Sequence, residues 1–258
     1  MLLAVDTGNT QTHIGIFRRE SLVAQWRTST NPDRTADELA LIFQQFLELV
    51  GLSFSREVTG VVLGSVVPSQ TAALREMVAR YFHFEPVVVE AGIRTGLPVK
   101  TDHPREVGAD RIVNAIAALD LAVPPLIVID FGTATTFDAI SDRGEYLGGA
   151  IAPGLEISAD ALFRVAAQIQ KVELVVPDDV VGRSTVEAVR SGVLLGAAAM
   201  VDGMIERMSK SLGGHASVLA TGGLAPKILP SCNSTIRHEP DLTLMGLRLL
   251  YERNAEPA

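Results

Sequence analysis

The sequence has one cysteine, Cys232, in 258 residues, and its five histidines are scattered. A single cysteine cannot form an internal disulfide, and no cysteine or histidine stands near another at the spacing of a zinc site. A disulfide-stabilised domain and a zinc module are therefore excluded. We expect Cys232 to be a thiol without a functional role, in a reducing compartment.

The chain also lacks a cluster of basic residues. Its 30 Asp plus Glu outnumber its 22 Lys plus Arg, which gives a formal net charge of −8. An acidic chain without a basic patch repels the phosphate backbone of nucleic acids. No nucleic-acid partner is expected.

Hydrophobic runs long enough to cross a membrane are missing from the sequence. The apolar N-terminus Met1–Val5 has no basic residues before it and meets Asp6 too soon for a signal peptide. The later apolar run Gly192–Val201 is shorter than the ~20 residues that span a bilayer. We expect a cytoplasmic protein without a membrane partner, whose 47% apolar residues supply a substantial core.

Apolar periodicity predicts strands that alternate with helices, beginning with a meander of three short strands. Thr35-Ala36-Asp37-Glu38 fits a capping box that opens a helix. Ser184-Thr185-Val186-Glu187 fits another, which opens a long helix through Gly203. Strands are expected at residues 2–5, 13–17, 22–27, 58–67, 87–90, 126–130, 135–140, 146–151 and 217–220, and helices at 36–50, 69–82, 104–119, 185–203 and 242–251.

The second half of the chain restarts the pattern of the first. A shift of about 120 residues aligns 2–16 with 126–140, and a search for such repeats is warranted before any other step. We interpret the match as the duplication of a β-β-β-α-β-α unit, with lobes at residues 1–120 and 121–258. The matched pairs are Leu2 with Leu126, Asp6 with Asp130, Gly8 with Gly132, Thr12 with Thr136, and Ile16 with Ile140.

A carboxylate followed by glycine and small polar residues stands at the end of the first strand of each half. In such a loop, backbone N–H groups can approach phosphate oxygens while the carboxylate holds a metal ion or its waters. Asp6-Thr7-Gly8-Asn9-Thr10 taken alone is more often a simple hairpin turn. Its counterpart, Asp130-Phe131-Gly132-Thr133-Ala134-Thr135-Thr136, has more hydroxyl groups than a hairpin needs, and these can donate to phosphate.

Thr221-Gly222-Gly223 follows an apolar strand and is the third such loop. A glycine pair alone is only a loop signal, but bare backbone there would let a flat nucleoside approach closely. Three glycine loops at strand ends, spread over two duplicated halves, are the arrangement of a nucleotide cleft between two lobes. The pattern predicts the α/β fold class of actin, hexokinase and Hsp70, a duplicated actin-like ATPase (ribonuclease H-like) fold with mixed sheets flanked by helices.

The string Glu106-Val107-Gly108-Ala109-Asp110-Arg111 places a Gly-Ala pair inside an expected helix. Such a glycine costs stability unless something must approach the backbone. Asp110 is a candidate general base for a hydroxyl acceptor, and Arg111 could pair with a carboxylate or a phosphate. A salt-bridged pair beside a glycine that packs against another helix explains the string equally well.

Two common families of phosphotransferase are excluded by missing motifs. The chain contains no Gly-x-x-x-x-Gly-Lys-Ser/Thr string and no His-Arg-Asp set. P-loop enzymes and protein kinases therefore do not fit.

Along nearly its whole length, the chain resembles type III pantothenate kinases. The resemblance rests on the Asp6, Glu106 and Asp130 strings above, on Gly148-Gly149-Ala150-Ile151-Ala152-Pro153-Gly154, and on the Thr221 string in support. Gly-Ala-Asp-Arg is the most diagnostic part, since sugar, acetate and glycerol kinases of the same superfamily share the phosphate loops without it.

The resemblance implies transfer of the γ-phosphoryl group of ATP to pantothenate, the first step of coenzyme A synthesis, by a homodimer. It implies that Asp130 holds a monovalent cation, potassium or ammonium, and that Thr185 reaches pantothenate across the dimer interface. Asp110 would accept the proton of the pantothenate hydroxyl, and Thr133 would contact the nucleotide phosphates. The ATP loop would comprise Asp6, beside Mg²⁺, with Thr7, Gly8, Asn9, Thr10, Gln11, Thr12 and His13, and the pantothenate contacts would be Gly108, Ala109, Asp110 and Arg111.

The residues alone leave two other functions open. The phosphate loops alone also permit a sugar kinase or an exopolyphosphatase, which an acceptor screen would distinguish. A non-catalytic regulator of transcription is the other, and salt-sensitive DNA binding would favour it.

Overall fold

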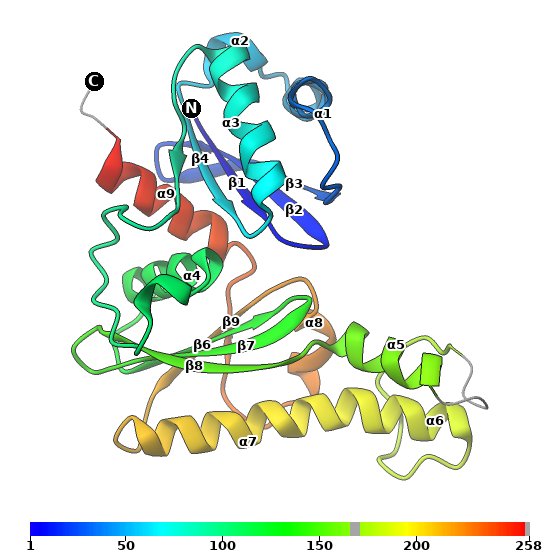
Figure 1. The fold of residues 1–258 in the computed structure, drawn as a ribbon. Helices are drawn as coiled ribbons and strands as arrows, with labels where there is room; N and C mark the ends of the chain where they lie inside the picture. The colour runs from blue at the N-terminus through cyan, green and yellow to red at the C-terminus, as the bar shows by residue number, and fades with distance from the viewer. Residues whose placement is uncertain (166–170, 256–258) are drawn as a thin grey trace. The chain divides into compact units, whose positions relative to one another are not determined.

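The computed structural model describes residues 1–165 and 171–255, which form two compact units, each with its own five-stranded mixed sheet (Figure 1). The first unit consists of Met1–Leu97, His103–Ala117 and the described residues from Asp241. The second consists of Pro98–Asp102 and the described residues between Ala118 and Pro240. The boundaries of these units differ from the predicted lobes, 1–120 and 121–258, because the C-terminal helix packs against the first sheet.

The first sheet has the strand order β3-β2-β1-β4-β5. Neighbouring strands in the meander β1-β2-β3 run antiparallel, whereas β4 runs parallel to β1 and β5 runs parallel to β4. Side chains alternate between the two faces, so β1 and β2 bury apolar residues on both sides. The bounds are β1 Leu2–Thr7, β2 Gln11–Arg18, β3 Ser21–Ser29, β4 Gly60–Ser65 and β5 Val87–Val88.

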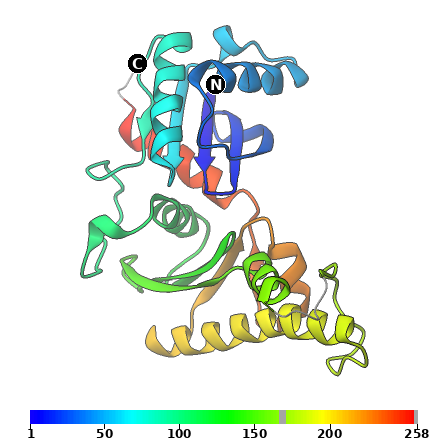
Figure 2. The same ribbon diagram turned by 45° about the vertical axis from the view of Figure 1, so that its right-hand side comes forward.

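Helices cover both faces of the first sheet (Figures 1 and 2). On one face, α1 (Ala36–Leu49) and α3 (Pro68–Phe82) bury the main core of the unit, with the short α2 (Phe54–Glu57) beside them. On the other face, α9 (Leu242–Asn254) contacts β1, β4 and β2. The first face receives Leu3, Val5, Ile14, Ile16 and Leu63, which pack against Leu39, Phe43, Leu74 and Met77 of the helices.

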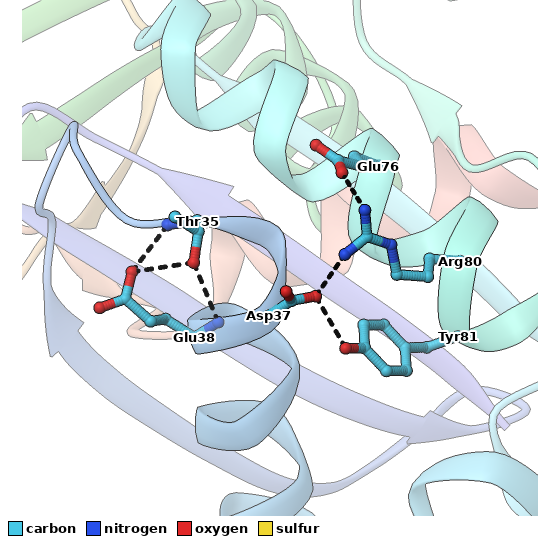
Figure 3. Close-up of polar contacts among 6 residues, drawn as sticks. All are labelled: Thr35, Asp37, Glu38, Glu76, Arg80 and Tyr81. Atoms are coloured by element: carbon cyan, nitrogen blue, oxygen red, sulfur yellow. Dashed lines mark hydrogen bonds and ion pairs between the residues drawn. The ribbon is translucent and has the colours of Figure 1, made fainter.

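The predicted capping box at Thr35 is confirmed (Figure 3). The Thr35 hydroxyl accepts from the Glu38 N–H at 3.3 Å, and the Glu38 carboxylate accepts from the Thr35 N–H at 2.9 Å. These two bonds satisfy donors that the first turn of a helix otherwise leaves unpaired. They fix where α1 begins.

A second polar cluster links the start of α1 to the end of α3 (Figure 3). Arg80 donates to Asp37 and to Glu76, both at 2.6 Å, and the Tyr81 hydroxyl donates to Asp37 at 2.8 Å. The Tyr81 bond, followed by the Arg80 bond, lowers the pKa of Asp37. Because these groups are exposed to solvent, they orient the two helices more than they stabilise them.

The second sheet has the order β10-β9-β6-β7-β8. Read in reverse, this is the order of the first sheet, with β6 to β10 in the places of β1 to β5. β6 and β7 pair antiparallel like β1 and β2, and β9 runs parallel to β6 as β4 does to β1. The predicted duplication is therefore visible in the topology. The bounds are β6 Leu126–Phe131, β7 Ala134–Ile140, β8 Tyr146–Pro153, β9 Ser217–Thr221 and β10 Arg237–His238.

The register corrects the predicted alignment of the two halves by one residue in the second strand. Thr12 pairs with Thr7 at the hairpin of the first sheet, but Thr135 pairs with Phe131 at the hairpin of the second. The turn between β6 and β7 is one residue shorter than that between β1 and β2. Thr12 therefore corresponds to Thr135 and not to Thr136, and the match of Ile16 with Ile140 is wrong for the same reason.

One face of the second sheet is covered by a long helix (Figures 1 and 2). Ile127, Ile129 and Phe137 pack against Ala198 and Val201 of this helix. It consists of α6 (Thr185–Arg190), a π-helical turn (η2, Ser191–Leu195) and α7 (Gly196–Ser211), and the smaller helices of the unit are α5 (Leu155–Val165), α8 (Ala225–Ile228) and η3 (Leu229–Ser231).

By length and composition alone, the 27 residues Thr185–Ser211 could cross a membrane. Core helices of soluble proteins, which are mostly buried, pass the same test, and 33% of the tested window is buried here. Ala198, Val201 and Ile205 of this helix lie in the core of the second unit. One face of this helix therefore packs in that core.

The helix expected from Pro104 to Leu119 is two elements. A 3₁₀ turn, η1 (Pro104–Glu106), is followed by extended backbone at Val107, and α4 (Ala109–Leu121) begins after Gly108. The placement of Gly108 inside a helix was wrong, and the stability cost argued from it does not arise. Gly108 stands instead at the entry of α4, where its carbonyl accepts from the Ile112 N–H at 3.3 Å.

Candidate functional site

The predicted loop of the first unit begins at Asp6, the last residue but one of β1. Asp6 pairs with His13 on β2 and with Gly64 on β4. A Cβ added at Gly64 would lie in ordinary contact with the Asp6 Oδ1 atom, at 3.7 Å. Asp6 is half-buried at the end of a rigid strand.

The tip of this loop is a tight turn. The Gly8 N–H donates to the Gln11 carbonyl at 3.0 Å, and the Thr30 N–H donates to the Thr10 carbonyl at 2.9 Å. Asn9, Thr10 and Gln11 are exposed to solvent. This end of the loop is thus fixed by backbone bonds and accessible to a ligand.

Five residues of the predicted ATP loop lie inside strands, and three of them, Thr7, Thr12 and His13, are buried. Thr7 and Thr12 are buried, and the Thr12 hydroxyl bonds to that of Thr30 at 2.9 Å. The Thr7 hydroxyl finds no hydrogen-bond partner among the described residues. His13 is 6% exposed. Because these three side chains are buried, they support the loop and do not face solvent, where a ligand would bind.

The imidazole of His13 is held by Gln25 of β3. The His13 Nε2 and Gln25 Oε1 atoms are 2.6 Å apart, and because an amide oxygen only accepts, Nε2 carries the proton. Burial lowers the pKa of His13, and the positive charge of Arg27 lowers it further. The ring is therefore neutral near pH 7 and leans toward β3.

In the second unit, three loops converge on the end of β6. Asp130 is half-buried, and Thr133 is exposed in the turn that follows. A Cβ added at Gly222 would lie 2.6 Å from the Asp130 Oδ1 atom and 2.5 Å from the Phe131 carbonyl oxygen. A Cβ added at Gly154 would collide with the Thr133 carbonyl oxygen. Only glycine lets β8 and β9 end this close to the turn.

The ligand atoms around Asp130 are oxygens, which suit magnesium and potassium rather than transition metals. Within the described ranges, no group of three or more His, Cys, Asp or Glu could hold a metal ion. The donor set thus fits a cation that takes one carboxylate and completes its shell with water and substrate oxygens.

The Gly-Ala-Asp-Arg string forms the first turn of α4 in the first unit. Asp110 lies there half-buried, and its Oδ1 atom accepts from the Arg111 N–H at 2.9 Å. A Cβ added at Gly108 would come within 2.5 Å of the same oxygen. Gly108 therefore gives the Asp110 carboxylate room at the positive end of the helix dipole.

Thr185 lies apart from the other predicted residues of the second unit. It is exposed at the start of α6, where Ser184 accepts from the Glu187 N–H at 3.3 Å as the N-cap. The Glu187 side chain accepts from Arg183 rather than from Ser184, so only one bond of the second predicted capping box is formed. Thr185 lines an open cavity of about 800 Å³ between α5 and α6, together with Ser158, Leu162, Gly182, Arg183, Ser184, Ala188, Val189, Gly192 and Val193.

Sequence comparison shows the family. The model of the type III pantothenate kinase family matches residues 2–207. A type III pantothenate kinase of Streptomyces coelicolor is 51% identical over 261 aligned positions, which cover 98% of each chain.

Comparison with solved structures agrees on the fold. A protein from Campylobacter jejuni described as a Baf family transcriptional activator superposes with a TM-score of 0.60 at 19% identity, over 97% of each chain. Component A of the (R)-2-hydroxyglutaryl-CoA dehydratase of Acidaminococcus fermentans gives 0.56 at 14% identity, over 97% of this chain and 96% of the other. The predicted duplicated α/β fold is confirmed.

Proposed function

The chain belongs to the type III pantothenate kinase family, and on that premise we propose that it transfers the γ-phosphoryl group of ATP to pantothenate. The product is 4′-phosphopantothenate, in the first step of coenzyme A biosynthesis. The observation that carries the proposal is the 51% identity to a type III pantothenate kinase along 98% of both chains. The two Asp-Gly loops and the Gly-Ala-Asp-Arg turn supply the chemistry that this transfer needs.

In the first unit, we assign the loop Asp6–His13 to ATP and Asp110 to general-base catalysis. The exposed turn Asn9–Gln11 would place its backbone near the phosphates, and Asp6 would hold a magnesium ion, which would neutralise phosphate charge during transfer. Asp110 accepts the proton of the acceptor hydroxyl as the new bond forms. Catalysis is positioning and charge neutralisation, without a covalent intermediate.

In the second unit, we assign Thr133 to the nucleotide phosphates and Asp130 to a monovalent cation, potassium or ammonium. The carboxylate oxygen and the space kept by Gly222 support this assignment. A monovalent cation at this place would add positive charge next to the phosphates without competing for the magnesium ligands.

We assign Gly108, Ala109, Asp110 and Arg111 to pantothenate. The guanidinium of Arg111 suits a carboxylate, and pantothenate carries one. Thr185 is assigned to pantothenate from the partner subunit of a homodimer.

A homodimer is supported by the surface of the second unit around α5 and α6. Large apolar side chains are exposed there next to the cavity that Thr185 lines, and such a concentration on a monomer marks an interaction site. The exposed residues are Ile157, Leu162, Val165, Val175, Val176, Val180, Val181 and Val186.

The cytoplasm is the proposed location, because ATP and reduced thiols are abundant there. Neither a nucleic acid nor a membrane is among the proposed partners, since the net charge of −8 disfavours the first and the long helix packs in a core.

The proposal is tested by ADP release from the purified protein with ATP and Mg²⁺. Pantothenate, glucose, acetate and glycerol serve in turn as acceptors, each with potassium or with sodium as the only monovalent cation. Of the four acceptors, we expect only pantothenate to support ADP release, and only in the potassium buffer. Turnover with another acceptor would contradict the substrate assignment, and equal rates in both buffers would contradict the assignment of Asp130.

A further inference from the structure

A row of polar side chains crosses the first sheet beside the predicted ATP loop. Asp6 on β1, His13 on β2 and Arg27 on β3 are directly opposite one another in the strand register. Directly opposed residues point to the same face, with Cβ atoms roughly 5 Å apart from one strand to the next. The guanidinium stem of Arg27 therefore starts about two strand spacings from the Asp6 carboxylate.

The row lies on the face that α9 covers only in part. The opposite face carries Trp26 and the other core residues toward α1, so Arg27 points to the α9 side. On that side α9 contacts β1, β2 and β4, while Gln25 and Arg27 on β3 are exposed. The Arg27 side chain thus stands in solvent at the end of the sheet where the loop Gly8–Thr10 begins.

The charges around this row are mixed. Asp241, just before α9, has a carboxylate oxygen that is buried and without a hydrogen-bond partner among the described residues. The charges of Asp241 and Arg27 both act on the pKa of His13, which Asp241 raises and Arg27 lowers. Gln25 already engages the Nε2 atom of that ring. No hydrogen bond or ion pair of the Arg27 guanidinium is found within residues 1–165 and 171–255.

Carboxylates together with one exposed guanidinium match a metal-polyphosphate complex. Carboxylate oxygens suit the metal ion and its waters, and a guanidinium suits the phosphate oxygens, to which it can donate two parallel hydrogen bonds. We propose that Arg27 is a further nucleotide-binding residue, whose guanidinium donates to a phosphate oxygen of the ATP held by the Asp6–His13 loop. This inference rests on the proposed function.

The test compares ATP and adenosine binding to the full chain by titration calorimetry with Mg²⁺. For Arg27→Gln we expect the ATP dissociation constant to rise about ten- to a hundredfold, since a hydrogen bond to a charged group is lost. Adenosine, which has no phosphate, should bind as it does to the unchanged protein. Arg27→Lys keeps a positive charge, and its ATP dissociation constant should lie between those of Arg27→Gln and the unchanged protein.

Arg18→Gln is the matched control. Arg18 is also exposed on the first sheet, but it lies at the far end of β2, about 17 Å of strand from His13. The Arg18→Gln variant should bind ATP with an affinity within twofold of that of the unchanged protein. Thermal unfolding of each variant reports whether the sheet is intact.

Two results would overturn the role of Arg27 while leaving the kinase in place. One is an ATP affinity for Arg27→Gln within twofold of the unchanged protein. The other is an equal loss for ATP and adenosine, which would mark a structural role of Arg27 at the edge strand. If the unchanged protein itself binds no ATP, the proposed function fails and this inference fails with it.

Discussion

The two strand-terminal aspartates face different neighbours. Across from Asp6 stands His13, a buried neutral imidazole held by Gln25. Across from Asp130 stands Thr136, whose hydroxyl is buried and finds no hydrogen-bond partner in the described part of the chain. The duplicated positions have therefore diverged at the residue opposite the aspartate in the strand register, as expected if the two loops bind different cations.

Gly222 is the residue on which the second loop most depends. Its φ of +96° is unfavourable for any other residue, and an added Cβ would meet Asp130 and the Phe131 carbonyl. We expect Gly222→Ala to cost about 1–3 kcal/mol of unfolding free energy and to weaken ATP binding at least tenfold. Urea unfolding and calorimetry measure the two effects.

Gly213→Ala is the control for that experiment. Gly213 has a similar φ of +100°, but an added Cβ there meets nothing within 4 Å. The Gly213→Ala variant should have the same backbone strain as Gly222→Ala but bind ATP as the unchanged protein does. Equal ATP affinity for both variants would show that the contact with Asp130 is unimportant.

Cys232 should be an unreactive thiol. Burial raises its pKa to about 11, and the nearby Asp202 charge acts in the same direction. At pH 8 about 0.1% of such a thiol is ionised, against roughly a quarter of a thiol with the usual pKa near 8.5. We expect Ellman's reagent to label the native protein ~100-fold more slowly than the urea-unfolded chain, and the native rate to rise about tenfold per pH unit from pH 8 to pH 10. A native rate that does not change with pH would contradict the raised pKa.

At the scale of elements, the long helix beside the second core is interrupted by a π-helical turn. The Ser191 hydroxyl in this turn donates to the Val180 carbonyl at 2.6 Å, which ties the segment before α6 to the helix. Gly192 and Val193 of the same turn line the cavity that contains Thr185. π-helical turns are often found at functional sites, and this one shapes the proposed substrate surface.

The start of α1 gives a clean test of local stabilisation. Thr35→Ala removes the capping hydroxyl, and we expect a loss of about 1 kcal/mol in unfolding free energy. Ser53→Ala is the matched control, because Ser53 is the N-cap of α2 but its side chain makes no capping bond. A loss at Ser53 as large as that at Thr35 would contradict the capping account.

Most long elements were predictable because periodicity and capping act locally. The strands 2–5, 126–130 and 217–220 and the helices 36–50, 69–82 and 242–251 are confirmed with ends shifted by one to three residues. α2, α8 and β10 were missed, because elements of two to four residues have no readable period. α5, with 11 residues, was missed as well, since no element was predicted between residues 151 and 184.

At the scale of the whole molecule, the sequence predicted where the glycine loops stand along the strands but not what surrounds them. Asp6 and Asp130 stand at strand ends as expected, since the strand pattern and the loop glycines are local signals. The close approach of Gly154 and Gly222 to the second loop depends on how distant strands end, which no local pattern reports. The row from Asp6 to Arg27 likewise depends on strand register.

The proposed homodimer predicts a molar mass near twice the 27.5 kDa of one chain in light scattering. Val181 is 70% exposed beside α6, and we expect Val181→Asp to weaken self-association at least tenfold by burying a charge in the interface. Val123→Asp is the control, since Val123 is 82% exposed in another loop of the same unit. A monomeric mass for the unchanged protein at every concentration would contradict the dimer.

The central claim is that this chain phosphorylates pantothenate with Asp110 as the base. The most direct measurement follows the label from [γ-³²P]ATP into pantothenate, with the unchanged protein and Asp110→Asn side by side. The account predicts labelled 4′-phosphopantothenate from the unchanged protein, a rate at least 100-fold lower from Asp110→Asn, and equal ATP affinity for both. Unlabelled pantothenate with the unchanged protein, or equal rates for the two proteins, would contradict it.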